Sequence, residues 1–322
     1  MSDAQPTLRD LSCAHDYDPN SMPVDKAREL IRRYLEPVVG IEQVNIRAAL
    51  GRILAKDIVS PVDVPAHDNS AMDGYAVRHA DLSAHGETTL TVVGSAFAGK
   101  PYTGTIGKGE CVRIMTGGVV PEGMDTIVMQ EHVRAAGGKV TIGTGHRRNQ
   151  NLRRAGEDLA RGGVALARGK LIGPADIGLV ASLGIAEAAV FRKLRVAFFS
   201  TGDELVSIGA PLGEGQIYDS NRYTIYGMLQ RLGVDAIDMG VVRDDPALIE
   251  SAFREAAGIA DAVITSGGVS VGEADFIKDL LNRLGEVVFW KIAMKPGRPL
   301  AYGRLGRAHF LGLPGNPVSV MV

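Results

Sequence analysis

The sequence is poor in the features that mark several classes of protein. Cysteine occurs only twice, as Cys13 and Cys111, which indicates neither a disulfide framework nor a cysteine metal cluster and favours a reducing cytoplasm. No apolar run reaches the about 18 residues of a membrane span, and the first residues lack the basic-then-apolar pattern of a signal peptide. The net charge is only −2, so no basic field favours nucleic acid. We therefore expect a cytoplasmic protein that binds neither membranes nor nucleic acid.

Most standard catalytic motifs are missing as well. There is no Walker A run, no GxGxxG, and no metal-ligand spacing among the seven histidines. One motif does occur, because Gly268–Gly272 reads GVSVG and matches the nucleophile elbow of hydrolases, with Ser270 as the nucleophile. However, an extra Ser-Gly separates this elbow from its strand, and the only later histidine, His309, opens a predicted strand. A hydrolase is therefore the weaker alternative.

The chain does contain segments of clearly different periodicity. Its 322 residues suffice for two or three domains, and residues 1–21 are polar enough to predict a disordered tail. A helix is predicted to begin at Pro23, with apolar residues at helical spacing: Ala27, Leu30, Ile31, Tyr34, Leu35 and Val38. Further helical patterns cover Ile46–Asp57 and Pro174–Ile185. Together they predict a helical and extended linker domain over 22–60 and 151–192.

Between these helical patterns the texture changes to short β-rich runs. Glycine-rich turns separate the runs Thr88–Val93, Cys111–Met115, Thr126–Met129 and Lys139–Ile142. Helical periodicity is absent from this stretch. We therefore predict a small all-β domain, barrel-like and inserted, over 61–150.

From residue 193 onward, strand and helix patterns alternate. The predicted strands are Arg195–Ser200, Ala236–Val242, Ala262–Thr265, Val287–Ile292, Leu300–Tyr302 and Phe310–Leu313. The predicted helices are Arg222–Leu232, Pro246–Ala257 and Phe276–Leu284. This alternation predicts a three-layer α/β domain with a mostly parallel sheet over 193–322, within a multidomain α/β protein.

The loops after these strands share one chemistry. They read STGDEL, RDD, SGGVSVGEAD and LPGNP, so acids and glycines recur where a parallel sheet binds its ligands. The acids Glu204, Asp244 and Asp275 are expected to converge there. The glycine-rich loop Thr265–Phe276 would present backbone N–H groups to an anion, with a divalent cation between that anion and the acids. The alternative is an ordinary turn whose acids cap the next helix.

Basic residues follow on a different element. Lys291 and Lys295 are four apart, so a strand would place both on one face, and Arg298 follows them. Such a group suits a multiply charged anion. The alternative is a pair of solvated lysines near a strand end.

The β region contributes three more polar segments. HDNSAMDGYAV begins at His67 and is rich in turn-forming residues. RIMTGG begins at Arg113 and ends a predicted strand, and NLRRAGED begins at Asn151 and mixes both signs of charge. Taken singly, each is explained by a turn or a solvated loop.

In combination these segments resemble the MoeA/gephyrin family of molybdopterin molybdenumtransferases. The matching motifs are DNSAMDGYAV, RIMTGG, RRAGED, STGDEL, GQIYDSN, RDD, SGGVSVGEAD, MKPGRP and GLPGNPVS, in the family's order from about residue 22 onward. The order resembles a bacterial stand-alone enzyme. The resemblance implies that molybdate is inserted into adenylylated molybdopterin with release of AMP, and that the process depends on Mg²⁺.

The resemblance also implies roles for individual residues. By motif match the functional positions are Asp73, Thr116, Asp158, Glu204, Asp244, Asp275, Lys291 and Lys295. The metal ligands among them are Glu204, Asp244 and Asp275. The strand-end loops and the basic segment would supply the substrate-binding residues Ser266, Gly267, Gly268, Ser270, Gly272, Arg298, Pro314, Gly315 and Asn316.

Assembly and alternatives follow from the same resemblance. We expect a homodimer in which the DNSAMDGYAV region of one subunit faces the α/β site of the other, and a molybdopterin adenylyltransferase is a further candidate partner. The alternatives are an adenylyltransferase-like activity that consumes ATP, or a ligand-binding or scaffold protein. Family members continue beyond GLPGNPVS with a small β domain, so we expect this chain, ending at Val322, to resemble a truncated and less stable member.

Overall fold

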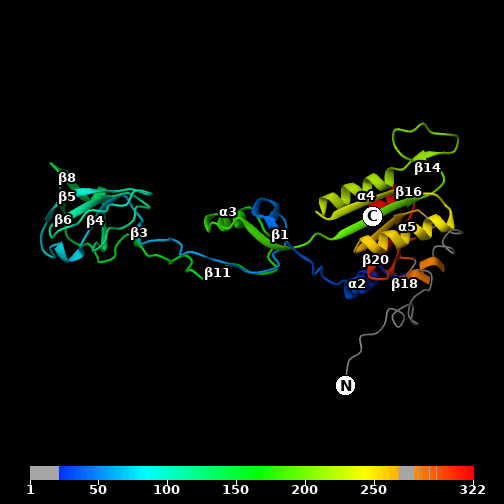
Figure 1. Ribbon diagram of the computed structural model, residues 1–322, viewed down its shortest axis with the longest axis horizontal. Helices are drawn as coiled ribbons and strands as arrows, with labels where there is room; N and C mark the ends of the chain where they lie inside the picture. Colours follow the sequence, from blue (N-terminus) through cyan, green and yellow to red (C-terminus); the bar gives the residue numbers. More distant parts are fainter. Residues whose placement is uncertain (1–21, 268–278, 282, 290, 295) are drawn as a thin grey trace, which may run out of the picture. The chain divides into compact units, whose positions relative to one another are not determined.

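The fold is taken from a computed structural model that describes residues 22–322 except 268–278, 282, 290 and 295 (Figure 1). The chain forms two compact units. One contains the residues up to Ile41 together with Phe191–Val322, and we call it the α/β unit. The other contains Glu42–Val190, and we call it the β unit. Because the β unit interrupts the α/β unit in the sequence, two chain crossings join them.

A six-stranded sheet in the order β16-β13-β17-β20-β19-β18 forms the centre of the α/β unit. The strands are β13 (Arg195–Thr201), β16 (Asp235–Val242), β17 (Ala262–Ser266), β18 (Gly285–Phe289), β19 (Ala301–Leu305) and β20 (Ala308–Leu313). The first four strands in the sheet order are parallel, whereas β19 and β18 pair antiparallel to their neighbours. The predicted parallel sheet is therefore correct for four strands, and the sheet as a whole is mixed.

Helices cover both faces of this sheet. The helices are α4 (Ser220–Arg231), α5 (Pro246–Ile259) and the short α7 (Pro317–Met321). Alternate residues of β13 point to opposite sides, so Phe198 packs with α4 residues while Phe199 packs with Phe253 of α5. The ribbon shows α4 and α5 on either side of the strands (Figure 1). Helices α4 and α5 each begin at an aspartate whose side chain accepts backbone N–H bonds, Asp219 for α4 and Asp245 for α5.

The first helix among the described residues, α2 (Val24–Tyr34), packs differently from the predicted grouping. The sequence groups it with the linker segments, but its buried Ala27 and Leu30 lie in a core with Phe289 and Tyr302 of the α/β unit. Its start is anchored by a bond from the Met22 N–H to the Lys291 carbonyl, 2.9 Å long. The helix ends at Tyr34, so Leu35, expected on the apolar face, is 53% exposed.

The β unit contains a second six-stranded sheet, in the order β7-β4-β6-β5-β9-β8. Its strands are β4 (Gly74–Val77), β5 (Thr88–Ala96), β6 (Glu110–Ile114), β7 (Thr126–Met129), β8 (Val133–Ala136) and β9 (Lys139–Ile142). All four strands predicted here are present. In this continuously described stretch, β7 and β8 are the edge strands and do not pair with each other, so the hydrogen bonding does not close a barrel.

The remainder of the β unit is extended chain stiffened by two-stranded pairs. The pairs are β1 (Ile41–Asn45) with β12 (Glu187–Phe191), β2 (Ile58–Val59) with β11 (Val164–Leu166), and β3 (Asn69–Ser70) with β10 (Leu152–Arg153). The helix predicted at Pro174–Ile185 is present as α3 (Pro174–Ser182). The helix predicted over Ile46–Asp57 is wrong, because only Ile46–Ala49 forms a 3₁₀ turn and Leu54 instead bridges to Val190 as extended chain.

Smaller elements complete the two units. They are η1 (Ile46–Ala49), η2 (His79–Asp81), η3 (Gln130–His132), β14 (Leu205–Val206) and β15 (Ile217–Tyr218). Among the described residues no helix is long and apolar enough to cross a membrane.

Candidate functional site

The strand order of the α/β unit predicts where a ligand binds. Along the chain, β13 is the first strand of this six-stranded sheet. The next two strands of the same sheet, β16 and β17, lie on opposite sides of β13. In a parallel sheet this reversal opens a crevice at the carboxyl ends of the strands. The crevice therefore lies beyond Thr201 of β13 and Ser266 of β17, where the sequence motifs begin.

Three of the expected substrate-binding residues meet at this point. The Gly267 N–H donates to the Leu313 carbonyl at 3.1 Å, which ties the end of β17 to the end of β20. A Cβ built on Gly315 would lie 3.9 Å from the Gly267 Cα, so the two loops are in contact. Ser266 is 2% exposed and sits beside both. The expected residues Gly268, Ser270 and Gly272 lie outside the described residues.

The segment LPGNP forms a loop after β20 and also the start of helix α7. The side chain of Asn316 accepts the Val318 N–H at 3.0 Å and so begins helix α7, with Pro317 at the first helical position. Gly315 is the residue of this segment that contacts the loop after β17. The substrate-binding roles of Pro314 and Asn316 stay predictions.

The structure adds a residue that was not assigned from the sequence. Asn221, in the first turn of α4, is 8% exposed and donates from Nδ2 to Ser266 Oγ at 2.8 Å and to the Gly315 carbonyl at 2.8 Å. Its only sequence signal was the GQIYDSN motif, in which it is the last residue. Asn221 therefore links α4 to both glycine loops.

Acidic residues lie on two loops of the same edge. The Asp203 N–H donates to Asp244 Oδ2 at 3.2 Å, and the Asp244 N–H donates to Asp203 Oδ1 at 3.3 Å. Burial raises the pKa of Asp244, and the charges of Asp203 and Glu204 raise it further. The structure thus brings the predicted Glu204 and Asp244 near one another and adds Asp203. Asp275 lies outside the described residues.

This acidic edge can be tested as a place for Mg²⁺. Hard carboxylate oxygens are the ligands that Mg²⁺ prefers, and neighbouring negative charges favour a divalent cation between them. However, no group of three His, Cys, Asp or Glu side chains within the described part of the chain is arranged to hold a metal ion. The donor chemistry fits, whereas a Mg²⁺ site stays a prediction.

The basic segment departs from its predicted geometry. The expected strand Val287–Ile292 ends at Phe289, so Lys291 follows the strand instead of belonging to it. The prediction that Lys291 and Lys295 share one face of a strand is therefore wrong, because Lys291 lies beyond the end of β18. Arg298 lies beside this segment, because its carbonyl accepts the Ile292 N–H at 2.9 Å. Lys295 lies outside the described residues.

In the β unit, two predicted residues make direct contact. The Asp73 carboxylate accepts the backbone N–H and the hydroxyl of Thr116, both at 2.8 Å. These two bonds lower the pKa of Asp73, the backbone bond most strongly. DNSAMDGYAV and RIMTGG are thereby joined, and the Gly117 N–H bond to the Ser70 carbonyl at 2.8 Å reinforces the contact.

The third polar segment of the β unit joins this pair. β10 pairs with β3, which places Arg153 opposite Asn69. Arg153 forms ion pairs with Glu157, at 2.6 Å, and with Asp158. Arg154 binds Asp68 at 2.6 Å. The expected Asp158 is half-exposed and is paired with Arg153, the last residue of β10.

The hydrolase alternative loses support from the position of His309. In the register of β17 with β20, His309 is opposite Ala262, the first residue of β17. The loop that contains Ser270 follows the last residue of β17, so the histidine lies at the opposite edge of the sheet. His309 also stacks on Tyr302 and contacts its hydroxyl oxygen at 3.1 Å.

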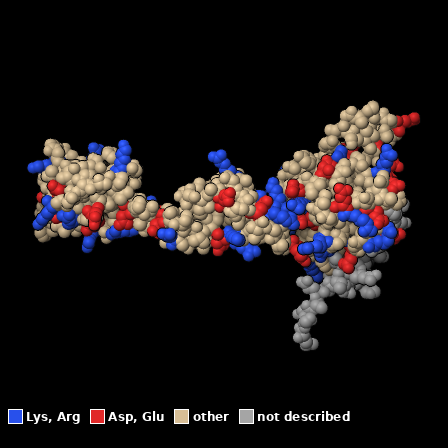
Figure 2. Space-filling model, in the orientation of Figure 1, with Lys and Arg blue, Asp and Glu red and all other residues tan. Residues whose placement is uncertain are grey.

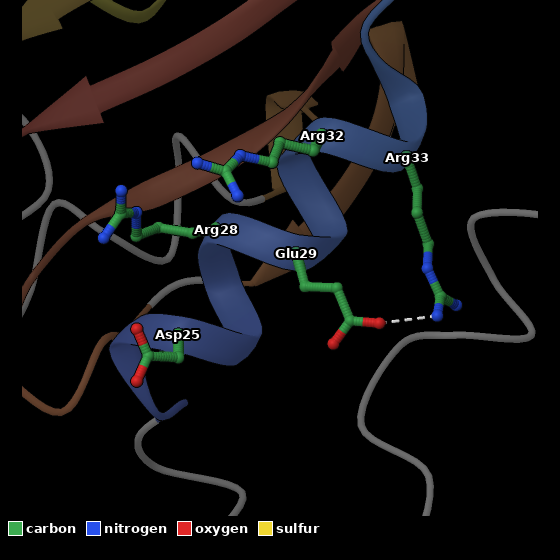
Figure 3. A pocket seen from close by; sticks show the side chains of 5 residues that line it. All are labelled: Asp25, Arg28, Glu29, Arg32 and Arg33. Atoms are coloured by element: carbon green, nitrogen blue, oxygen red, sulfur yellow. Dashed lines mark hydrogen bonds and ion pairs between the residues drawn. The ribbon is translucent and has the colours of Figure 1, made fainter.

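Among the described residues, a surface hollow lies apart from the motif residues. Acidic and basic side chains are interspersed over the visible face (Figure 2), with no field of one sign. A hollow of about 410 Å³ lies along α2 (Figure 3), lined by Asp25, Arg28, Glu29, Arg32 and Arg33. Glu29 pairs with Arg33 at 2.6 Å, while Arg28 and Arg32 project from the other side of the helix (Figure 3). None of the motif residues lines it.

Comparison with known proteins places these motifs in context. Residues 22–184 match the model of the MoeA N-terminal region (domain I and II), and residues 197–322 match a probable molybdopterin binding domain. A molybdopterin molybdenumtransferase of Haemophilus influenzae is 49% identical over 302 residues, 94% of this chain and 74% of that protein. A molybdopterin molybdenumtransferase of Nostoc is 38% identical over 96% of this chain and 73% of its own length.

Solved structures give the same picture. The crystal structure of the molybdopterin biosynthesis MoeA protein from Pyrococcus horikosii matches with a TM-score of 0.80 and 36% identity. The match covers 94% of this chain and 76% of that one.

Proposed function

Because this chain belongs to the MoeA family of molybdenum cofactor biosynthesis proteins, we propose that it inserts molybdate into adenylylated molybdopterin and releases AMP. The observation that carries the proposal is the crevice between β13 and β17. Serine, glycine and paired aspartates from separate motifs meet there, at the place where an α/β sheet binds a nucleotide-like ligand. The cytoplasm suits this chemistry, because thiol sulfurs stay reduced there.

The residues divide into two roles in this proposal. The loops at Ser266, Gly267 and Gly315, with Lys291 and Arg298, bind the phosphate groups through hydroxyl, amide and cationic donors. Asp203, Glu204 and Asp244 form the acidic side of the crevice. Mg²⁺ bound there would neutralise the charge that develops on the phosphoryl oxygens. The carboxylates would orient the oxygen of water or molybdate that forms the new bond to phosphorus, as the pyrophosphate bond breaks and AMP leaves.

A direct assay tests the proposal. Purified protein supplied with adenylylated molybdopterin should release AMP only when molybdate and Mg²⁺ are both present, and chelation of divalent metal should stop release. AMP release that is indifferent to molybdate would contradict the proposed transfer. Consumption of ATP with free molybdopterin would show adenylyltransferase activity instead, and tight ligand binding without AMP release would show a binding module.

We further propose that the protein acts as a homodimer with shared sites. The motifs are divided between two units, with Asp73 and Thr116 in the β unit and Asp244 in the α/β unit. The α/β unit also leaves large side chains of α4 exposed, including Tyr223, Tyr226 and Met228. A second copy of the chain would cover such a face and complete the site. A molybdopterin adenylyltransferase is the proposed supplier of the adenylylated substrate.

Mixing two inactive variants tests the shared site. Asp73→Ala and Asp244→Ala chains, refolded together in equal amounts, should recover about one quarter of wild-type AMP release, because half the dimers are mixed and each has one intact site. Each variant alone should stay inactive. A mixture as inactive as its components would show that each site is built within one chain.

A further inference from the structure

The side chain of Asn221 has an orientation that its two partners determine. The Gly315 carbonyl can only accept a hydrogen bond, so the atom 2.8 Å from it must be the NH₂ group of the amide. The same Nδ2 lies 2.8 Å from Ser266 Oγ. Nitrogen of an amide has no lone pair to offer, so Ser266 Oγ must accept this bond.

That assignment determines the state of the Ser266 hydroxyl. With Asn221 donating to its oxygen, the Ser266 O–H proton is free to donate elsewhere. Within the described residues, the bond from Asn221 is the one hydrogen bond that Ser266 Oγ makes. The oxygen that accepts one bond also becomes a stronger donor through its own proton. Ser266 is therefore prepared to donate a hydrogen bond, and it is 2% exposed.

Other buried polar atoms around Ser266 also have no partner. Ser200 is paired in register with Ser266, and its hydroxyl is unpartnered within the described structure. Thr201 Oγ1, also unpartnered, would lie 3.2 Å from a Cβ built on Gly267. Asn221 Oδ1 is a further unpartnered atom. Buried polar groups are rarely left unsatisfied, so a cluster of them at a strand-end crevice indicates a polar ligand.

We propose that Asn221 is a positioning residue: it holds Ser266 as a hydrogen-bond donor to an anionic oxygen of the ligand. Phosphate and molybdate present the same acceptor chemistry, and either could be the group bound. The identity of the ligand in this inference rests on the proposed function. The hydrogen-bond geometry of Asn221 and Ser266 is independent of that function. It gives GQIYDSN a role in binding, although Asn221 itself need not touch the ligand.

A double-mutant cycle tests whether Asn221 acts through Ser266. Inorganic phosphate and molybdate serve as separate probes, with dissociation constants measured by calorimetry on Asn221→Ala, Ser266→Ala and the double variant. Each single substitution should raise the dissociation constant of one of the two anions about tenfold. The double variant should bind that anion no more weakly than Ser266→Ala alone. The anion that responds identifies the bound group. Additive losses, or no loss for either anion, would overturn the proposal.

Two further variants separate positioning from general damage. Asn221→Asp keeps the shape of the side chain, but its carboxylate would accept the hydrogen bond from the Ser266 hydroxyl. Anion binding should therefore weaken at least as much as in Asn221→Ala. Thr224→Ala removes another side-chain bond of α4, from Thr224 Oγ1 to the Ser220 carbonyl, and should leave anion binding unchanged. Equal losses in the Thr224 control would assign the effect to the helix. If the double-mutant cycle shows the expected coupling between Asn221 and Ser266 but the wild-type protein releases no AMP, only the proposed function is contradicted.

Discussion

Asp244→Asn should lower AMP release by at least ~100-fold, the scale of losing one preorganised electrostatic group. The substitution keeps the shape of the side chain and an oxygen that can accept the Asp203 N–H, now 3.2 Å away. It removes the charge that we assign to the binding of Mg²⁺ and the orientation of the attacking oxygen. The measurement is the initial rate of AMP release at saturating molybdate and Mg²⁺.

The thermal midpoint of the same variant should be unchanged or higher at neutral pH. Burial, with the charges of Asp203 and Glu204, raises the pKa of Asp244 in the folded protein. A raised acid pKa means that the ionised form opposes folding, so this cost is present above the folded pKa and disappears as the pH falls through it. Asparagine removes the cost at neutral pH.

Asp235→Asn is the matched control, because Asp235 begins the same strand, β16, at the opposite edge of the sheet. It should leave the AMP release rate within about twofold of wild type. Two outcomes count against the assignment of Asp244: an unaltered rate in Asp244→Asn, or a large fall in thermal midpoint that explains the lost rate.

Gly267→Ala should destabilise the α/β unit and abolish most of its activity. Gly267 has φ +91°, a conformation that costs other residues on the order of 1–3 kcal/mol. An added Cβ would also lie 2.5 Å from the Thr201 carbonyl oxygen, which is backbone at the end of the neighbouring strand β13. The loop must therefore move away from β13, and Ser266 moves with it. We expect AMP release to fall by at least ~100-fold, as misplaced groups lose their catalytic geometry.

Denaturant unfolding and the AMP assay together measure this effect. Gly258→Ala is the control, since Gly258 lies in helix α5 and a Cβ there meets nothing within 4 Å. Alanine is the better helix former, so this variant should be as stable as wild type or up to about 1 kcal/mol more stable. If Gly267→Ala keeps wild-type stability and rate, the close contact between Gly267 and Thr201 is not required.

The sequence by itself determined the local elements and the chemistry of the loops. Strands such as Arg195–Thr201 and helices such as Pro246–Ile259 were predictable because periodicity and capping residues act between near neighbours. The motifs also identified the family, since many short segments agree in order. The helical pattern of Ile46–Asp57 was misleading, because most of that segment forms extended chain that pairs with residues distant in the sequence.

Only the tertiary structure decided which distant groups meet. That α2 packs on β18 and β19, and that Asp203 faces Asp244, depends on the strand order of the sheet. The amide of Asn221 contacts residues 45 and 94 positions away in the sequence. Such contacts leave no periodic trace, because they depend on how sheet and helices pack together and not on the residues beside them. The sequence thus supplied the groups, and the packing of β13, β17 and α4 decided how they are arranged.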